Sequence, residues 1–244
     1  MILDGHVHAG TGDGLNGPWD TAAPLDRYAA RAARAGIDRA VIFPVFHSAP
    51  RVANAEVARI ARSDPTRWIP FAFVDPVADR GRIAAMVRHH VLRDGFRGMK
   101  VHRHQAGITR EVCEVARALA IPVLYDVAGR VAQVHLLAEA YPDVAFIIPH
   151  LGSFADDWAA QRALIDLLPR YPNVFADTSG VRRFDLLEDA VRIAGAGRLI
   201  FGSDGPWLHP GVELAKVRAL GLRPRAEAMI LGETLLRLIA RGPR

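Results

Sequence analysis

Eight apolar segments, each followed by a helix-like segment, constrain the fold of this 244-residue chain more than any other feature. Each segment is five to eight residues long and rich in aliphatic residues, as is typical of strands buried on both faces. Eight strand–helix repeats predict a (β/α)8 TIM barrel, an α/β fold, with residues 1–244 forming a single domain. The expected strands are Met1–His8, Arg39–Val45, Trp68–Val74, Phe96–His102, Pro122–Asp126, Val144–His150, Val174–Thr178 and Leu199–Asp204.

The segments between these strands have the apolar spacing of amphipathic helices, with apolar residues at i, i+3 and i+4. Examples are PLDRYAARAARAG and TREVCEVARALA. A doubly wound sheet is the alternative fold, and the glycine pattern over residues 12–17 matches the phosphate-binding loop of such folds. Pro18 and Trp19 follow that pattern where a helix should begin, and the second strand lacks the terminal acid that binds ribose. We therefore expect a loop there and no dinucleotide cofactor.

The basic residues are spread along the whole chain and form no patch. The formal net charge is +5, and of the 31 basic residues only Lys100 and Lys216 are lysines. Nucleic-acid-binding proteins concentrate positive charge on one face, so we expect no nucleic-acid partner. There is no charged leader or long apolar run, and the single cysteine, Cys113, falls in a helix-like segment. These features favour a cytoplasmic protein without a disulfide or a membrane span.

The first expected strand contains two histidines at alternate positions, His6 and His8. Residues i and i+2 of a strand point to the same side, so both imidazoles project together at the carboxyl end of this strand. Two neighbouring imidazoles form half of a typical zinc site. A His-x-His pair also arises by chance, so the other strand ends must decide between the two interpretations.

Polar residues repeatedly close the apolar strands at their carboxyl ends, where the active sites of TIM barrels lie. Buried charges without partners are costly, so we expect these groups to share one ion or one hydrogen-bond network. Beyond the histidine pair, these residues are Lys100 and His102 on the fourth strand, Asp126 on the fifth, His150 on the sixth and Asp204 on the eighth.

Six motifs occur in a fixed order: DGHVH, GFRGMKVH, IPVLYD, IIPHLGS, NVFADTSG and IFGSDGP. Together they resemble the amidohydrolase superfamily, in its amidohydrolase-related branch of metal-dependent hydrolases and decarboxylases. They cover the expected barrel from residue 1 to about residue 207. The later segment MILGETLLRLI resembles the family's closing helix, with Gly232-Glu233 where the family usually has Gly-Asn.

The resemblance implies one divalent metal ion at the barrel mouth, zinc or alternatively manganese. It implies that His6 and His8 bind the metal, and that Asp204 is both a ligand and a proton acceptor. It implies that His150 either binds the ion or hydrogen-bonds its water. The family commonly has a metal-binding histidine at the end of the fifth strand, where this chain has Asp126. A carboxylate binds zinc at a similar bond length, so the metal-ligand set is expected to include this residue.

Asp126 and Lys100 each have two interpretations. Asp126 either joins the ligand set or instead holds Arg130, four residues further on, or a nearby histidine. In binuclear members of the superfamily a lysine of the fourth strand is carboxylated and bridges two ions, whereas in the single-metal branch it does not bridge. We expect one ion, and a substrate-binding or structural role for Lys100. Asp177, at the end of the seventh strand, is expected to support a histidine or Lys100.

The resemblance implies a metal-dependent hydrolase in which a metal-activated water attacks an amide, ester or lactone carbonyl. Asp204 and His150 are the expected catalytic residues. The alternative is a non-oxidative decarboxylase that uses the same site, but decarboxylases of the family tend to be longer, which favours hydrolysis here. A barrel that binds a small molecule without turnover is a third hypothesis. The substrate is expected to be small, and anionic if Lys100, His102 and Arg130 contact it. A homodimer is compatible with these features.

Overall fold

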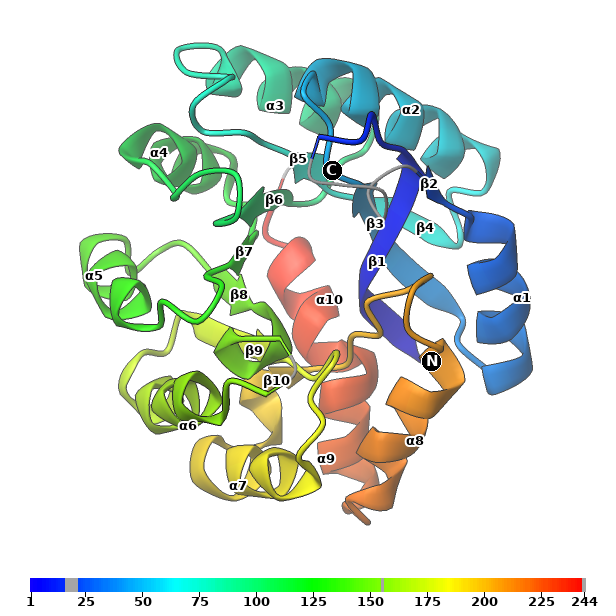
Figure 1. Cartoon of the computed structure of the whole chain (residues 1–244), viewed down its shortest axis with the longest axis vertical. Coiled ribbons are helices and arrows are strands. Elements are labelled where there is room, and N and C mark those ends of the chain that lie inside the picture. The colour runs from blue at the N-terminus through cyan, green and yellow to red at the C-terminus, as the bar shows by residue number, and fades with distance from the viewer. Residues whose placement is uncertain (16–21, 155, 243–244) are drawn as a thin grey trace.

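The eight expected strands form a ring with helices around its outside (Figure 1). The structure is a computed structural model, and it describes residues 1–15, 22–154 and 156–242. The glycine pattern over residues 12–17 lies partly outside these ranges. The ring strands are β1 (Leu3–Thr11), β3 (Arg39–Pro44), β4 (Trp68–Pro70) with β5 (Ala72–Phe73), β6 (Met99–His102), β7 (Val123–Asp126), β8 (Phe146–Ile148), β9 (Val174–Asp177) and β10 (Leu199–Ile200).

Backbone hydrogen bonds close the ring at two seams, the places where one of its two sheets meets the other. The strands pair in the orders β2-β1-β3-β4 and β10-β9-β8-β7-β6-β5, and all pairs are parallel except that of β1 with the short β2 (Ala22–Ala23). β4 and β5 are two halves of one bent strand: the N–H of Phe71 binds the carbonyl of Ile42 on one side, and that of Ala72 binds Gly98 on the other. At the second seam, Gly5 N–H lies 2.8 Å from the carbonyl oxygen of Phe201. The predicted eight-stranded TIM barrel is therefore confirmed.

Most of the helices present an apolar stripe to the strands. In α4, the buried residues Val112, Cys113, Val115 and Ala116 have helical spacing and face the barrel. None of the helices in the described ranges is both long and apolar enough to cross a membrane. The α-helices are α1 (Leu25–Ala35), α2 (Pro50–Ser63), α3 (Ile83–Arg93), α4 (Arg110–Leu119), α5 (Ala132–Ala140), α6 (Trp158–Leu167), α7 (Phe184–Ala194), α8 (Pro210–Ala219), α9 (Pro224–Ala228) and α10 (Thr234–Ile239).

Two apolar clusters separate the barrel interior from the layer between strands and helices. The outer cluster joins the strands to the surrounding helices. The inner cluster fills the lower part of the barrel, and α10 closes that end with Leu235, Leu238 and Ile239, in the centre of Figure 1. Its other members are Leu3, Val41, Phe43, Ile69, Phe71, Leu124, Ala145, Ile147, Phe175 and Ile200. Only the opposite end of the barrel, at the carboxyl ends of the strands, remains for a polar site.

Two strands end earlier than the sequence pattern predicts. The sixth was expected to reach His150 and the eighth Asp204, but regular pairing stops at Ile148 and Ile200. His150 has a φ of 58° and Asp204 a φ of 55°, in the left-handed region that is unfavourable for such residues. Apolar periodicity gives no sign of this backbone turn. Strained backbone of this kind gathers at functional sites.

Candidate metal centre

A cavity of about 590 Å³ opens at the carboxyl ends of the strands. It contains seven of the eight residues that the sequence singles out for the site. Arg130 is the exception: it is exposed, does not line the cavity, and precedes α5 in a turn. The predicted residues that line the cavity are His6, His8, Lys100, His102, Asp126, His150 and Asp204.

His6, His8 and Asp204 form a tight cluster in this cavity. One potential ligand atom from each lies within 4.8 Å of the other two. Asp204 Oδ1 stands 3.4 Å from His6 Nε2 and 3.2 Å from His8 Nε2. Burial lowers the pKa of His8 to about 3, so its imidazole is neutral and able to bind a metal at ordinary pH.

The tautomer of His6 shows that a cation fits this cluster. His6 Nδ1 lies 2.7 Å from Asp177 Oδ2, so Nδ1 carries the proton and donates it to the carboxylate. Nε2 therefore presents a lone pair toward Asp204, and it is buried without a hydrogen bond among the described residues. Two lone-pair atoms facing each other repel unless a proton or metal ion lies between them. Burial is the main cause of a lowered pKa of His6, which disfavours the extra proton and leaves the metal ion as the better fit.

Asp177, the last residue of β9, and Ser179, two residues further on, orient His150 as well as His6. His150 Nδ1 lies 2.9 Å from the carbonyl oxygen of Ser179, and His150 N–H donates to Asp177 Oδ1. The Nδ1 proton therefore points away from the cavity, and Nε2 presents a lone pair toward it. The predicted supporting role of Asp177 agrees with these contacts. The Ser179 hydroxyl also lies 2.9 Å from His150 Nδ1 and donates to Asp177 Oδ1, a role that the sequence analysis did not assign to Ser179.

Asp126 is buried and pairs with His102. Asp126 Oδ2 lies 3.0 Å from His102 Nε2, while Oδ1 accepts the N–H of Ala128. The same Oδ2 is 3.7 Å from His150 Nε2, one contact away from the metal cluster. Burial would raise the pKa of Asp126, but His102, His150 and Lys100 outweigh it and hold that pKa well below its usual range. Asp126 is thus an anion at the cavity wall, and the alternative pairing with Arg130 is absent among the described contacts.

Lys100 places an amine at the base of the cavity. Its side chain is 2% exposed, and Nζ has no hydrogen-bond partner among the described residues. Nζ stands 4.9 Å from the centre of the Phe43 ring, which favours a cation there. Burial lowers the pKa of Lys100, while the nearby carboxylates, Asp126 first, act in the opposite direction. A buried amine without a hydrogen-bond partner is suited to donate a hydrogen bond to an acceptor atom of a ligand.

Asp4 is a structural residue of the site that the sequence analysis missed. One oxygen accepts the N–H groups of His6 and Ser203, and the other accepts the hydroxyl of Tyr28 at 2.8 Å. Asp4 thereby ties β1 to the segment that leads to Asp204. Burial raises the pKa of Asp4 to about 7 against the effect of these donors. The signal was present, since Asp4 precedes His6 by two residues on the same strand.

Three aromatic side chains surround the mouth of the cavity. Trp207 lies 4.4 Å from the His8 ring, between ring centres, and Phe154 packs edge-on against His150. Phe46 packs in the same way against His102. The aromatic residues come from the loops after β3, β8 and β10, and all three line the cavity. Their exposed faces make the entrance apolar although its floor is charged.

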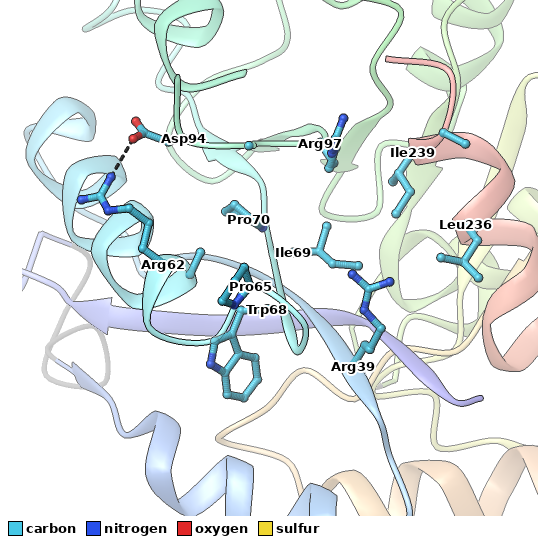
Figure 2. A pocket seen from close by; sticks show the side chains of 13 residues that line it. Arg39, Arg62, Pro65, Trp68, Ile69, Pro70, Asp94, Arg97, Leu236 and Ile239 are labelled. Carbon is cyan, nitrogen blue, oxygen red and sulfur yellow. Dashed lines mark hydrogen bonds and ion pairs between the residues drawn. The ribbon is translucent and has the colours of Figure 1, made fainter. Parts of the chain in front are cut away.

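Two further features of the barrel lie away from this cluster. A second cavity, of about 510 Å³, opens at the amino ends of β3 and β4 beside α10 (Figure 2). Its residues include the ion pair of Arg62 with Asp94, at 2.7 Å, and Arg39 beside Leu236. His89, His90 and Asp94 at the end of α3 also bring ligand atoms together, but the Arg62 guanidinium already neutralises that carboxylate. Neither feature combines an orphaned ligand atom with a cavity as the upper site does.

A closed (β/α)8 barrel with histidines and carboxylates at the carboxyl ends of its strands is the arrangement of a TIM-barrel enzyme. The amidohydrolase family model matches residues 4–242, so the chain belongs to the amidohydrolase family. The resemblance drawn from the six motifs is therefore confirmed. The matched family consists of enzymes of the amidohydrolase superfamily, which bind divalent metal ions. No curated protein matches the sequence.

Solved structures of this superfamily share the fold. An amidohydrolase from Burkholderia multivorans has a TM-score of 0.81 at 18% identity, with 100% of both chains covered. A dihydroxybenzoic acid decarboxylase from Polaromonas sp. JS666, with bound manganese, has a TM-score of 0.71 at 18% identity, covering 98% of this chain and 96% of that one. A 4-oxalomesaconate hydratase from Rhodopseudomonas palustris has a TM-score of 0.72 at 18% identity, covering 99% and 96%. Because the decarboxylase is covered almost completely, chain length does not distinguish hydrolysis from decarboxylation.

Proposed function

We propose that this protein is a metal-dependent hydrolase that cleaves an amide, ester or lactone bond in a small anionic substrate. One observation carries the proposal: the buried Nε2 lone pair of His6 faces the Asp204 carboxylate, with no proton donor between them. The ion would be held by His6, His8 and Asp204, with His150 and Asp126 beside them. Zinc suits this nitrogen-and-oxygen donor set, and manganese, the metal of the structurally similar decarboxylase, is the alternative. A bound divalent ion would lower the pKa of water and polarise the substrate carbonyl.

Asp204 would move the proton. Burial raises its pKa, but the His8 contact and the nearby His6 and His150 outweigh burial and hold the pKa well below the usual range. The carboxylate is therefore ionised and can accept a proton from the attacking water. As the water oxygen bonds to the carbonyl carbon, the bond to the leaving nitrogen or oxygen breaks, and Asp204 returns the proton to that atom. His150 Nε2, with its lone pair toward the cavity, would accept a hydrogen bond from the water and orient it.

Lys100 would bind the anionic group of the substrate. Its Nζ is the buried amine without a hydrogen-bond partner at the cavity base, so a substrate carboxylate would satisfy it. His102 lines the same side of the cavity and is held by Asp126, which places it within reach of the same group. Arg130 is exposed, so we propose no substrate contact for it in this conformation.

Decarboxylation is the second candidate, and the Lys100 amine is the observation that favours it. A carboxylate drawn to Lys100 would lie within the same cavity as Asp126 and Asp204, which could handle the proton that replaces carbon dioxide. The structurally similar dihydroxybenzoic acid decarboxylase shows that the fold supports this reaction. The two candidates differ in product, because only decarboxylation releases carbon dioxide.

Metal analysis followed by product analysis tests the proposal. Protein purified without chelator should contain about one equivalent of divalent metal, as three or four protein ligands hold one ion in such sites. The metal-loaded protein should then be assayed against lactones, esters, amides and aromatic carboxylic acids. Hydrolysis of one of the first three classes supports the proposal. Carbon dioxide release without hydrolysis replaces it with decarboxylation, and two equivalents of metal with a carboxylated Lys100 would overturn the single-ion site.

A further inference from the structure

The segment 177–181, which begins at the last residue of β9, is buried and mostly polar. Asp177 in this segment binds His6, and Ser179 binds His150. Gly180 has a φ of 65°, and a Cβ on it would lie 2.6 Å from the Phe154 ring, so only glycine fits there. Val181 packs in the outer apolar cluster, and the N–H of Thr178 binds the carbonyl of Ile200 on β10. The peptide N–H of Gly180, between these two anchors, bonds outside the segment.

Two residues of α8 form hydrogen bonds with the backbone of this segment. Glu213 accepts the N–H of Gly180 at 3.0 Å, and Lys216 donates from Nζ to the carbonyl of Val181 at 2.9 Å. The two side chains also pair with each other, with Glu213 Oε2 2.6 Å from Lys216 Nζ. The contacts form one ring that joins the helix to the backbone of two successive residues, Gly180 and Val181.

This pair differs from the other glutamate–cation pairs on the helices. The Glu213 side chain is 8% exposed, whereas Glu114, which pairs with Arg117 at the same spacing on α4, is 34% exposed. Burying a carboxylate is costly, and burial accordingly raises the pKa of Glu213. An exposed pair of this kind contributes little to stability, so simple helix stabilisation does not account for placing Glu213 inside the protein.

We propose that Glu213 and Lys216 are positioning residues: they form a clamp that fixes the segment 177–181 and, through Ser179, the tautomer of His150. With the segment in place, the Ser179 carbonyl accepts a hydrogen bond from the Nδ1–H of His150, and the Nε2 lone pair points toward the cavity. Because α8 follows the loop that carries Asp204, the clamp also fixes the segment after β9 relative to that carboxylate. The catalytic consequence rests on the proposed function, but the tautomer of His150 can be measured without any reaction.

Nitrogen NMR of histidine-labelled protein tests the clamp at pH 8, with a His150→Gln variant to assign the ring signals. We expect His150 to be in the Nδ1–H form in the wild type and to become a mixture of tautomers in Glu213→Ala and Lys216→Met. Competition with a chromophoric chelator should show zinc affinity reduced by about 10-fold, the lower end of effects seen for groups that orient ligands. Lys216→Arg, which still donates to the carbonyl and the carboxylate, should restore the Nδ1–H form.

Two controls separate positioning from general stability. Glu114→Gln removes the matched exposed pair on α4 and should change neither the tautomer nor the zinc affinity. The double variant Glu213→Lys with Lys216→Glu reverses the ion pair but leaves no acceptor for the Gly180 N–H, so it should not restore the Nδ1–H form. Restoration by this double variant, or an unchanged His150 tautomer in Lys216→Met, would overturn the clamp. If Glu213→Ala does not fold, Glu213→Gln replaces it: this variant retains the acceptor and should keep the Nδ1–H form. Absence of bound zinc in every variant would count against the proposed function alone.

Discussion

The three residues of the metal cluster differ in what each can do chemically. His6 and His8 offer neutral nitrogens, and both are almost fully buried. Asp204 offers a carboxylate that is held ionised and that also faces the cavity. Under the proposed function, loss of an imidazole would remove a ligand, whereas loss of the Asp204 charge would remove the group that carries the proton.

We accordingly predict a split between metal content and turnover. His6→Ala and His8→Ala should lower the bound metal well below one equivalent, because each removes one of three or four donors. Asp204→Asn should retain much of the metal through its amide oxygen and lose turnover by at least about 100-fold, as expected when a positioned proton-transfer group is removed. Elemental analysis and a product assay on the same samples measure both effects. Near-normal turnover in Asp204→Asn would remove Asp204 from proton transfer.

Asp126 is the residue whose loss is most informative for the ligand set. It lies 3.7 Å from His150 Nε2 and binds His102, so the anion belongs to the cavity. If Asp126 binds the ion, Asp126→Ala should sharply weaken metal retention, and Asp126→His should restore it because imidazole is an equivalent ligand. Dialysis against a chelator, followed by elemental analysis, compares the variants. Unchanged retention in Asp126→Ala would leave the ion to His6, His8, His150 and Asp204.

The thiol of Cys113 should be unreactive in the native protein. It is fully buried in α4, and burial, with a smaller effect of Glu114, raises the pKa of its thiol to about 12. The thiolate is the reactive form, so at pH 8 the native protein should react with a disulfide reagent far more slowly than the protein in guanidinium. Because the folded state keeps the proton above pH 9, where the unfolded thiol ionises, this residue makes folding less favourable as pH rises further. Fast labelling of the native protein would contradict the buried thiol.

At the residue scale, the sequence predicts where a side chain lies better than which residues it contacts. Alternation along a strand places His6 and His8 on one side, and both line the cavity. A nearby histidine was one expected partner of Asp126, but its identity as His102 depends on the register between two different strands, which the sequence does not show. The contact of Ser179 with His150 was missed as well, because it joins two loops that lie far apart in the sequence and uses both the carbonyl and the hydroxyl of Ser179.

At the scale of elements, α10 closes the amino end of the barrel. Leu235, Leu238 and Ile239 enter the interior cluster beside strand residues such as Leu3 and Ile200. The helix therefore replaces solvent at the end of the barrel opposite the site. Its apolar spacing was visible in the sequence, but its place at the bottom of the ring depends on the complete fold.

Truncating one of these side chains should destabilise the barrel without changing the site. Leu238 is fully buried, so Leu238→Ala should reduce the free energy of unfolding by about 2–5 kcal/mol. Leu136→Ala on α5 is the matched control, because that side chain is 65% exposed and its loss should change little. Urea unfolding measures the difference, and zinc affinity at low temperature should remain near the wild-type value. Equal stabilities for the two variants would mean that α10 does not close the barrel.

The alternation of strands and helices was predictable along the whole chain, whereas strand ends were less so. All eight expected strands are present, because the apolar runs and helical spacing repeat clearly. The turns at His150 and Asp204 were missed because a left-handed backbone has no apolar period. The bend that divides β4 from β5 was also invisible, since Phe71 continues the same apolar run.

At the scale of the whole molecule, the metal cluster lies across the seam where the barrel closes. His6 belongs to β1 and Asp204 follows β10, and the neighbouring contact of Asp4 with Ser203 joins residues 199 positions apart. We predict that a fragment ending at Gly195, which lacks β10 and Asp204, will not retain zinc against a chelator. A fragment that retains the ion as tightly as the full chain would show that the histidines suffice.

The position of the seam has a consequence for how this protein matures. A ribosome releases the first strand, with both histidines, long before it makes the last one, so the nascent chain carries ligands that have nothing to complete them. Closing a loop of nearly the whole chain is entropically slow and comes late in folding. If His6, His8 and Asp204 hold the proposed ion, its uptake would require that synthesis has passed the eighth strand, and a bound ion would indicate a completed barrel.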